Sequence, residues 1–276
     1  MKIRKPAVSG RFYPSNKNEL KKLIKKIIDI ELKNIKTDFS SNVIIGALVP
    51  HAGYMYSAYQ AVHFFEILKR SVQKFDTFVI LNPNHTGYGS EIALDENDAW
   101  ETPFGIVNID TELSDLVNFD KSSSAHSHEH SGEVMIPLLQ YFLDYKFKIL
   151  PITMSVQNFY NAQLIANRIN LAEKKLNKNV CFIASSDLSH FVSPEFGKRQ
   201  DMKVIQKVLN FESEEIINTV KKEKISMCGY GPAATLTEYA MIKSNNPKAE
   251  LLKFGHSGEV HHSKEVVNYA SVLVYE

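Results

Sequence analysis

The sequence predicts an α/β fold, a single domain over residues 1–276 with a mainly parallel central sheet and helices on both faces. Two observations lead to this prediction. Short apolar runs rich in β-branched residues alternate along the chain with longer segments of helical periodicity, which is the pattern of a layered α/β protein. Neither an internal repeat nor a domain linker interrupts the 276 residues, and a chain of that length can bury a sizeable core.

In the first half of the chain, Ile3–Pro14 carries Pro6, Gly10 and Pro14, so it is expected to be an extended arm anchored by Phe12 and Tyr13. Hydrophobic periodicity and turn residues define the elements that follow. They are a helix from Ser15 to about Asp29, a strand from Val43, a helix from Ser57 to Lys69, a strand at Phe78–Leu81, a hairpin-like pair at Glu91–Leu94 and Ile106–Ile109 around a loop at Trp100–Gly105, and a short helix at Thr111–Val117.

In the second half, Asp120–Gly132 is rich in Ser and His and has no apolar period, so a loop is expected there. The remaining segments continue the alternation of helix and strand. They are helix Glu133–Tyr145, strand Phe147–Ile152, helix Asn158–Leu176, the strand from Val180, a mostly helical stretch Pro194–Lys224, a helix opened by Pro232, and strands Leu251–Phe254 and Ala270–Tyr275.

Composition limits the classes of function. The formal net charge is +1, with 44% hydrophobic and 23% charged residues, so a nucleic-acid partner is not predicted. Cys181 and Cys228 lie far apart, which argues against a disulfide framework and favours a reducing compartment. No signal core and no run of ~18 apolar residues is found, so a cytoplasmic protein without a membrane segment is expected. Two lysine clusters are interpreted as solvated helix faces: Lys21, Lys22, Lys25 and Lys26, and Lys221, Lys222 and Lys224.

Three of the predicted strands run into a turn that carries a histidine. His51 follows the strand from Val43, His85 follows Phe78–Leu81, and His190 follows the strand from Val180. The carboxyl ends of parallel strands meet at one edge of a sheet, where α/β proteins bind ligands. Converging imidazoles suit a divalent transition metal. The sequence therefore predicts a metal site at this edge.

Other candidate residues surround these histidines. Cys228 lies in a glycine-rich turn at a helix start, where the helix dipole and a metal would favour a thiolate, although the position taken alone indicates an inert thiol. Asp187 either orients an imidazole or caps a helix. The stretch from His126 to Glu133 is either a surface metal-scavenging tract or a loop that brings one imidazole and one carboxylate into the pocket. Phosphate-binding glycine motifs and the GxSxG nucleophile elbow are missing.

At these positions the sequence resembles the Memo family, the middle member of the AMMECR–Memo–radical-SAM set. The resemblance covers nearly the whole chain and rests on motifs in the family's order. They are RKPAVSGRFYP, VPHAGYMYSA, NPNHTGYG, WETPFG, EHSGEV, SSDLSH and CGYGP. The family in turn is similar to class III extradiol ring-cleaving dioxygenases, which hold non-haem Fe(II) by two histidines and one carboxylate.

This resemblance implies roles for particular residues. His51 and His85 match the two metal-binding histidines, and Cys228 matches the position whose thiolate replaces the dioxygenase carboxylate. His190 matches a pocket histidine that acts as acid/base in the dioxygenases, His130 lies at the other pocket histidine of the family, and Asp187 and Glu129 flank these. Fe(II) is the first expectation for the metal. Cu or Zn are the alternatives, because a soft thiolate shifts the metal preference towards softer ions.

Three functions follow from these residues. The first is a metal-dependent, dioxygenase-like oxidoreductase that acts on an unknown small molecule, with His190, His130 and Asp187 as the catalytic groups. The second is a non-enzymatic module that binds a peptide or a partner in the same pocket. The resemblance implies AMMECR-domain and radical-SAM proteins as candidate partners. An aromatic or peptide ligand would be suited by Tyr54, Tyr56, Tyr88, Trp100 and Tyr230. The third is zinc-dependent hydrolysis, which lacks a recognisable general base.

Overall fold

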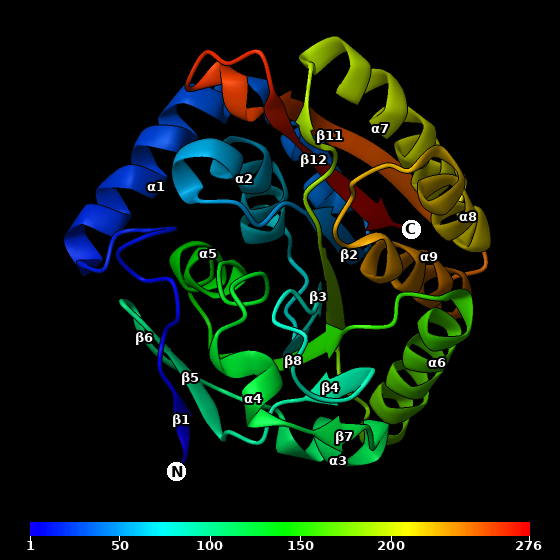
Figure 1. The fold of residues 1–276 in the computed structure, drawn as a ribbon. Coiled ribbons are helices and arrows are strands. Elements are labelled where there is room, and N and C mark those ends of the chain that lie inside the picture. Colours follow the sequence, from blue (N-terminus) through cyan, green and yellow to red (C-terminus); the bar gives the residue numbers. More distant parts are fainter.

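One large mixed sheet forms the centre of the computed structural model, which describes residues 1–276 (Figure 1). Its main path has the order β10-β12-β2-β9-β3-β8-β4-β7, and β11 pairs with β12. The strands of this sheet are β2 (Ile44–Val49), β3 (Thr77–Pro83), β4 (Ile92–Leu94), β7 (Asp120–Lys121), β8 (Lys148–Met154), β9 (Val180–Ser185), β10 (His190–Val192), β11 (Lys248–His256) and β12 (Val266–Tyr275).

The four central strands β2, β9, β3 and β8 are parallel to one another. All residues of β2, β3 and β9 are buried, as expected for parallel strands covered on both faces. The flanking pairs β12–β2, β11–β12, β10–β12 and β4–β8 are antiparallel. The predicted parallel sheet is therefore confirmed at the centre, and antiparallel strands extend it on both sides.

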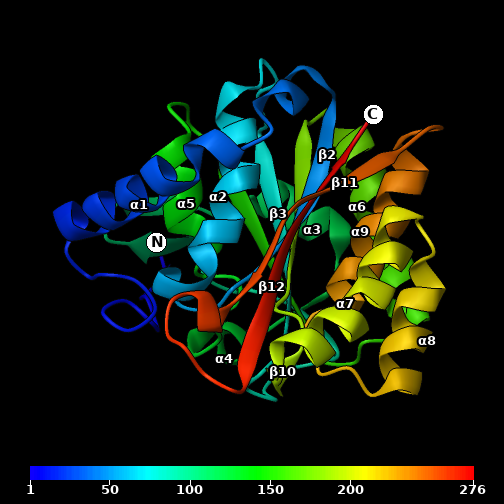
Figure 2. The same cartoon turned by 90° about the horizontal axis from the view of Figure 1, so that it is seen from above.

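Helices cover both faces of the sheet, as predicted, and each face has its own apolar core (Figure 2). On one side lie α1, α2 and α5, and on the other α6, α7, α8 and α9. The helices are α1 (Lys17–Glu31), α2 (Tyr54–Arg70), α3 (Thr111–Val117), α4 (Ser123–Ser127), α5 (Met135–Phe142), α6 (Phe159–Leu176), α7 (Pro194–Leu209), α8 (Ser213–Glu223) and α9 (Tyr230–Lys243), with short 3₁₀ turns at Leu32–Asn34, Thr37–Ser41 and Ser257–Glu259.

A second, three-stranded sheet lies beside the first and has the order β1-β5-β6. It consists of β1 (Ile3–Arg4), β5 (Ala99–Thr102) and β6 (Gly105–Asn108). The sequence-based expectation was wrong here in two respects. Ala99–Thr102 is a strand and not part of a loop, and the antiparallel hairpin joins β5 to β6, whereas β4 pairs with β8 in the large sheet. Pairing with β1 and β6 outweighs the loop signals of Pro103 and Gly105.

The stretch from Asp120 to Gly132 was expected to be a loop, and this too needs correction. It contains the short strand β7 and the helix α4, whose first turn is capped by the Ser122 hydroxyl, which accepts from the backbone N–H of Ala125. Residues 128–134 then connect α4 to α5 and carry Glu129 and His130. None of the helices has the length and apolar composition needed to cross a bilayer.

Candidate metal centre

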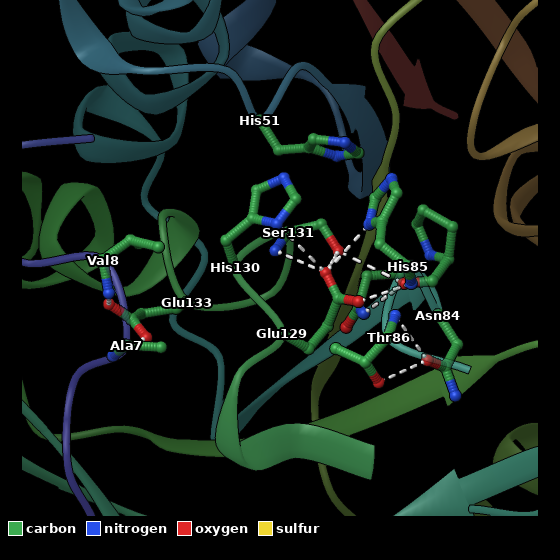
Figure 3. A network of polar contacts seen from close by, with 12 residues as sticks. Ala7, Val8, His51, Asn84, His85, Thr86, Glu129, His130, Ser131 and Glu133 are labelled. Carbon is green, nitrogen blue, oxygen red and sulfur yellow. Dashed lines mark hydrogen bonds and ion pairs between the residues drawn. The ribbon is translucent and has the colours of Figure 1, made fainter. Parts of the chain in front are cut away.

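The predicted site residues lie where the central strands end. β2, β9 and β3 are adjacent and parallel, so the turns after their carboxyl ends share one edge of the sheet. His51 follows β2, His85 follows β3, and Ser186 and Asp187 follow β9. Two further segments reach this edge: the α4–α5 connection with Glu129 and His130, and the turn before α9 with Cys228 (Figure 3 draws the histidines and Glu129).

His51 is almost fully buried, and its surroundings determine its tautomer. Its Nδ1 lies 2.7 Å from the Ser185 hydroxyl, and that hydroxyl donates its own proton to the Ser131 carbonyl at 2.7 Å. The hydroxyl must therefore accept from Nδ1–H, which leaves the lone pair of the neutral ring on Nε2. Nε2 lies 3.2 Å from the Cys228 sulfur. Burial, and then the neighbouring histidines, lower the pKa of His51 well below its ordinary value.

His85 is held in the same tautomer by Glu129. Its Nδ1 lies 2.9 Å from Glu129 Oε1, and its backbone N–H donates to Oε2 at 2.6 Å (Figure 3). Burial alone would raise the pKa of Glu129, but hydrogen bonds and charge from His85 and Ser131 outweigh it and lower that pKa to about 2. The ionised carboxylate accepts from Nδ1–H, so Nε2 of His85 is again free to bind a metal.

Cys228 is fixed by the turn that follows β9. The backbone N–H of Asp187 donates to its sulfur at 3.2 Å, and the Cys228 N–H lies 3.4 Å from the Asp187 carbonyl. Gly229 allows this close approach, since a Cβ there would lie 2.3 Å from the Ser185 carbonyl oxygen. Burial, and then the charge of Asp187, raise the pKa of the Cys228 thiol. A cation at the sulfur acts in the opposite direction and favours the thiolate.

These residues fit a transition metal. The donor atoms of His51, His85 and Cys228 all lie within 4.8 Å of one another. A second, overlapping group joins His85, Glu129 and His130. Two neutral imidazole nitrogens and one sulfur are the donors that iron, copper and zinc accept, and a carboxylate on the far nitrogen of His85 is the usual support of a metal-bound imidazole.

His130 lies beside the two histidines of this group. Its ring centre is 5.3 Å from that of His51 and 4.8 Å from that of His85. Phe12 from the N-terminal arm also packs against His130, with ring centres 4.8 Å apart. Burial outweighs the nearby carboxylate of Glu129 and lowers the pKa of His130 to about 4, so the ring is neutral at pH 7 and able to accept a proton.

Asp187 and His190 occupy different positions. Asp187 is buried and accepts from the backbone N–H groups of His51 and Ala52, at 2.7 and 3.3 Å, and burial raises its pKa to about 6. His190 begins β10, outside both groups of donor atoms, and its Nδ1 donates to the Ser226 carbonyl at 2.8 Å. The structure thus brings His51, His85, Cys228 and His130 together, with Asp187 hydrogen-bonded to the turn of His51 and His190 outside both groups.

The contacts that hold the α4–α5 connection in place were not predicted from the sequence. Arg4 is buried, donates to the carbonyls of His126 and Glu129 at 2.7 Å each, and pairs with the Glu133 carboxylate at 2.7 Å. Glu133 also accepts from Ala7, Val8 and Tyr13 of the arm (Figure 3 includes Ala7, Val8 and Glu133). No local pattern could have revealed partners 129 residues apart. Trp100, a candidate ligand-binding aromatic, instead stacks on Arg4 in the interior.

The fold and the site define an α/β protein with a histidine–cysteine cluster at the carboxyl ends of its central strands. The model of the Memo family, described as Memo-like protein, matches residues 4–273. A "MEMO1 family protein" of Methanococcoides burtonii is 41% identical over 99% of this chain and 100% of its own length. Another, from Methanobrevibacter smithii, is 38% identical over 98% of each chain. The chain therefore belongs to the Memo family.

Among solved structures, an uncharacterised protein of Escherichia coli K12 is similar with a TM-score of 0.47 and 10% sequence identity. The similarity covers 83% of this chain and 99% of that chain.

Proposed function

We propose that the protein binds a transition metal through His51, His85 and Cys228 and acts as a dioxygenase-like oxidoreductase. One observation carries the proposal: both imidazoles donate Nδ1–H to a fixed acceptor, so both Nε2 atoms are left for a metal beside the Cys228 sulfur. Fe(II) is the first candidate, and Cu or Zn are alternatives that accept the same donors. Iron bound there would supply redox chemistry and Lewis acidity.

The protein's own residues would supply proton transfer and positioning. His130, neutral and beside His51 and His85, is placed to take a proton from a substrate hydroxyl. Asp187 holds the turn of His51 through two backbone hydrogen bonds. His190, with Nδ1–H on the Ser226 carbonyl, keeps Nε2 as a proton acceptor at the outer rim.

The substrate class proposed here is a small molecule, and the compartment is the cytoplasm. The partners proposed are the AMMECR-domain and radical-SAM proteins implied by the family resemblance. A peptide bound without turnover in the same pocket is the competing assignment, and an oxygen-consumption assay on a catechol panel separates the two.

The deciding experiment is elemental analysis of protein purified without oxygen from cells grown with mixed metals. The wild-type chain is expected to carry close to one iron or copper per chain, and His51→Ala/His85→Ala is expected to carry none. The matched control is His128→Ala/His262→Ala, two exposed histidines outside the donor groups, which should keep the metal. Stoichiometric metal in the His51→Ala/His85→Ala protein would refute the proposal.

A further inference from the structure

A groove lined by lysines lies away from the metal centre. Its volume is about 950 Å³, near the upper end of the roughly 300–1,000 Å³ of ligand pockets. Four segments form it: the first turns of α1, the end of α2, strand β6, and the end of α5 with the residues after it. Figure 1 places α1, α5 and β6 on one side of the molecule.

The groove is strongly positive although the chain as a whole is nearly neutral. Six lysines line it and no acidic side chain does, whereas the chain has a formal net charge of +1. Of these lysines only Lys25 has an ion-pair partner, Asp29. The six are Lys17, Lys21, Lys22, Lys25, Lys69 and Lys146. Unpaired cations gathered around one concave surface attract an anionic ligand.

Apolar and aromatic side chains lie between these lysines. Ile106 is 49% exposed although it is in a strand, and Phe104 and Tyr141 pack with ring centres 6.3 Å apart. Tyr145 and Phe147 also line the groove. The sequence favoured a solvated helix face for the lysine cluster at Lys21. That interpretation does not explain why aromatic side chains lie between the lysines of the groove. Apolar contacts flanked by cations suit a ligand that alternates carboxylates with apolar groups.

Strand β6 favours a polypeptide over a nucleic acid. It is the outer strand of its sheet, and it pairs with β5 alone among the strands. Three consecutive residues, Ile106, Val107 and Asn108, line the groove, whereas successive side chains of a strand point to opposite faces. An exposed strand edge binds an extended peptide backbone. No arginine lines the groove, although arginine is the residue best suited to bidentate hydrogen bonding with phosphates.

We propose that this groove binds an acidic, extended segment of a partner protein, with its carboxylates on the lysines and its apolar side chains over Ile106 and Tyr141. This site is separate from the metal centre. Lys69 lies at the end of α2 and His51 precedes its start, and a helix of 17 residues spans about 25 Å. Metal binding and groove binding can therefore fail independently.

The test uses fluorescence anisotropy with a labelled peptide of about eight residues that alternates Glu with Phe, Val and Leu and is about 26 Å long when extended. The full chain is expected to bind it saturably, more weakly as salt rises. Lys21→Glu/Lys22→Glu should weaken binding by roughly tenfold or more, because like charges then face each other. Both lysines are exposed and unpaired, so the fold and the metal content should not change.

The chain offers a matched control. Lys221→Glu/Lys222→Glu reverses two adjacent exposed lysines of α8, outside the groove, and should bind the peptide as the wild type does. Tyr141→Ala should also weaken binding without changing its salt dependence. The proposal is overturned if the wild type does not bind the peptide, if both double variants bind equally, or if an oligothymidylate of similar charge binds more tightly than the peptide.

Discussion

The carboxylate of Glu129 holds His85 at two points, with Oε1 2.9 Å from the ring Nδ1 and Oε2 2.6 Å from the backbone nitrogen. Ser131 donates to the same carboxylate through its hydroxyl and its N–H. Glu129 is thus positioned to fix the tautomer and the orientation of the His85 imidazole, a candidate metal ligand, without itself belonging to the donor group of His51, His85 and Cys228.

Glu129→Gln should therefore weaken metal binding while the candidate ligands stay in place. Loss of such an outer carboxylate typically lowers metal affinity by about 10–100-fold. Titration with Co²⁺ in competition with a chromogenic chelator measures the change, and circular dichroism checks the fold. Glu101→Gln, in an exposed pair with Lys5, is the control and should bind as the wild type does. Equal affinities for the two variants would rule out this role for Glu129.

Arg4→Met should destabilise the protein strongly. Arg4 and Glu133 are both buried, and breaking such a pair leaves an uncompensated charge at a cost of about 3–5 kcal/mol. Urea unfolding measures the free energy. Arg4→Met/Glu133→Gln should be less unstable than the sum of the two single variants, because the orphaned charge is gone. Strict additivity would show that the pair is not coupled.

The control for this prediction is Lys5→Met. Lys5 neighbours Arg4 in sequence, but its ion pair with Glu101 is exposed to solvent. Exposed pairs contribute little, so the unfolding free energy of this variant should stay close to that of the wild type.

The histidines that follow strands were predictable from the strand ends, whereas Cys228 and His130 were predicted only through the family resemblance, and the contacts that hold them were not predicted. Apolar runs ending at His51 and His85 placed both rings at one sheet edge, because parallel strands share their carboxyl ends. His190 follows β9 in the same way, yet it begins β10, which pairs with β12, and this pairing carries it outside the donor groups. Strand ends alone therefore do not determine which histidines converge.

Long-range pairing also explains the errors in the fold prediction. Ala99–Thr102 pairs with β1, about a hundred residues earlier, and residue types that read locally as a loop gave no sign of it. The ion pair of Arg4 and Glu133 is equally invisible to a local pattern, although both residues lie in motifs typical of the family. Local propensity indicates most of the elements, but contacts distant in sequence create some of them, such as Ala99–Thr102, and decide how the elements assemble.

Gly229→Ala should displace Cys228. A Cβ at this position would lie 2.3 Å from the Ser185 carbonyl oxygen and 2.6 Å from Ser186 Cβ, so the turn must move. Overpacking of this kind costs about 1–3 kcal/mol. Near-ultraviolet absorption of the Co²⁺-loaded protein reports cobalt–thiolate bonding, and this band should weaken. Gly53→Ala is the control at the same edge of the sheet, since its nearest contact would be 3.5 Å. A full thiolate band in Gly229→Ala would contradict the prediction.

Asp110 lies at the opposite end of the sheet from the candidate metal centre, and it should make the stability of the protein depend on pH. Burial alone would raise its pKa, but Lys178, with Nζ 2.7 and 2.9 Å from the two carboxylate oxygens, and the Thr77 hydroxyl outweigh it and hold the pKa below its ordinary value. The folded state then binds this proton less readily than the unfolded state. The stabilisation is complete above the unfolded pKa of about 3.9 and is lost as pH falls through the lower folded value.

Asp110→Asn should therefore reduce the unfolding free energy most at neutral pH, and its difference from the wild type should shrink as pH falls from about 5 to about 3. Urea unfolding at a series of pH values measures this difference in metal-free protein. Glu112→Gln is the control, because Glu112 binds the same Lys178 from an exposed position. A difference between Asp110→Asn and wild type that stays constant across this range would mean that the Asp110–Lys178 contact contributes through packing and not through charge.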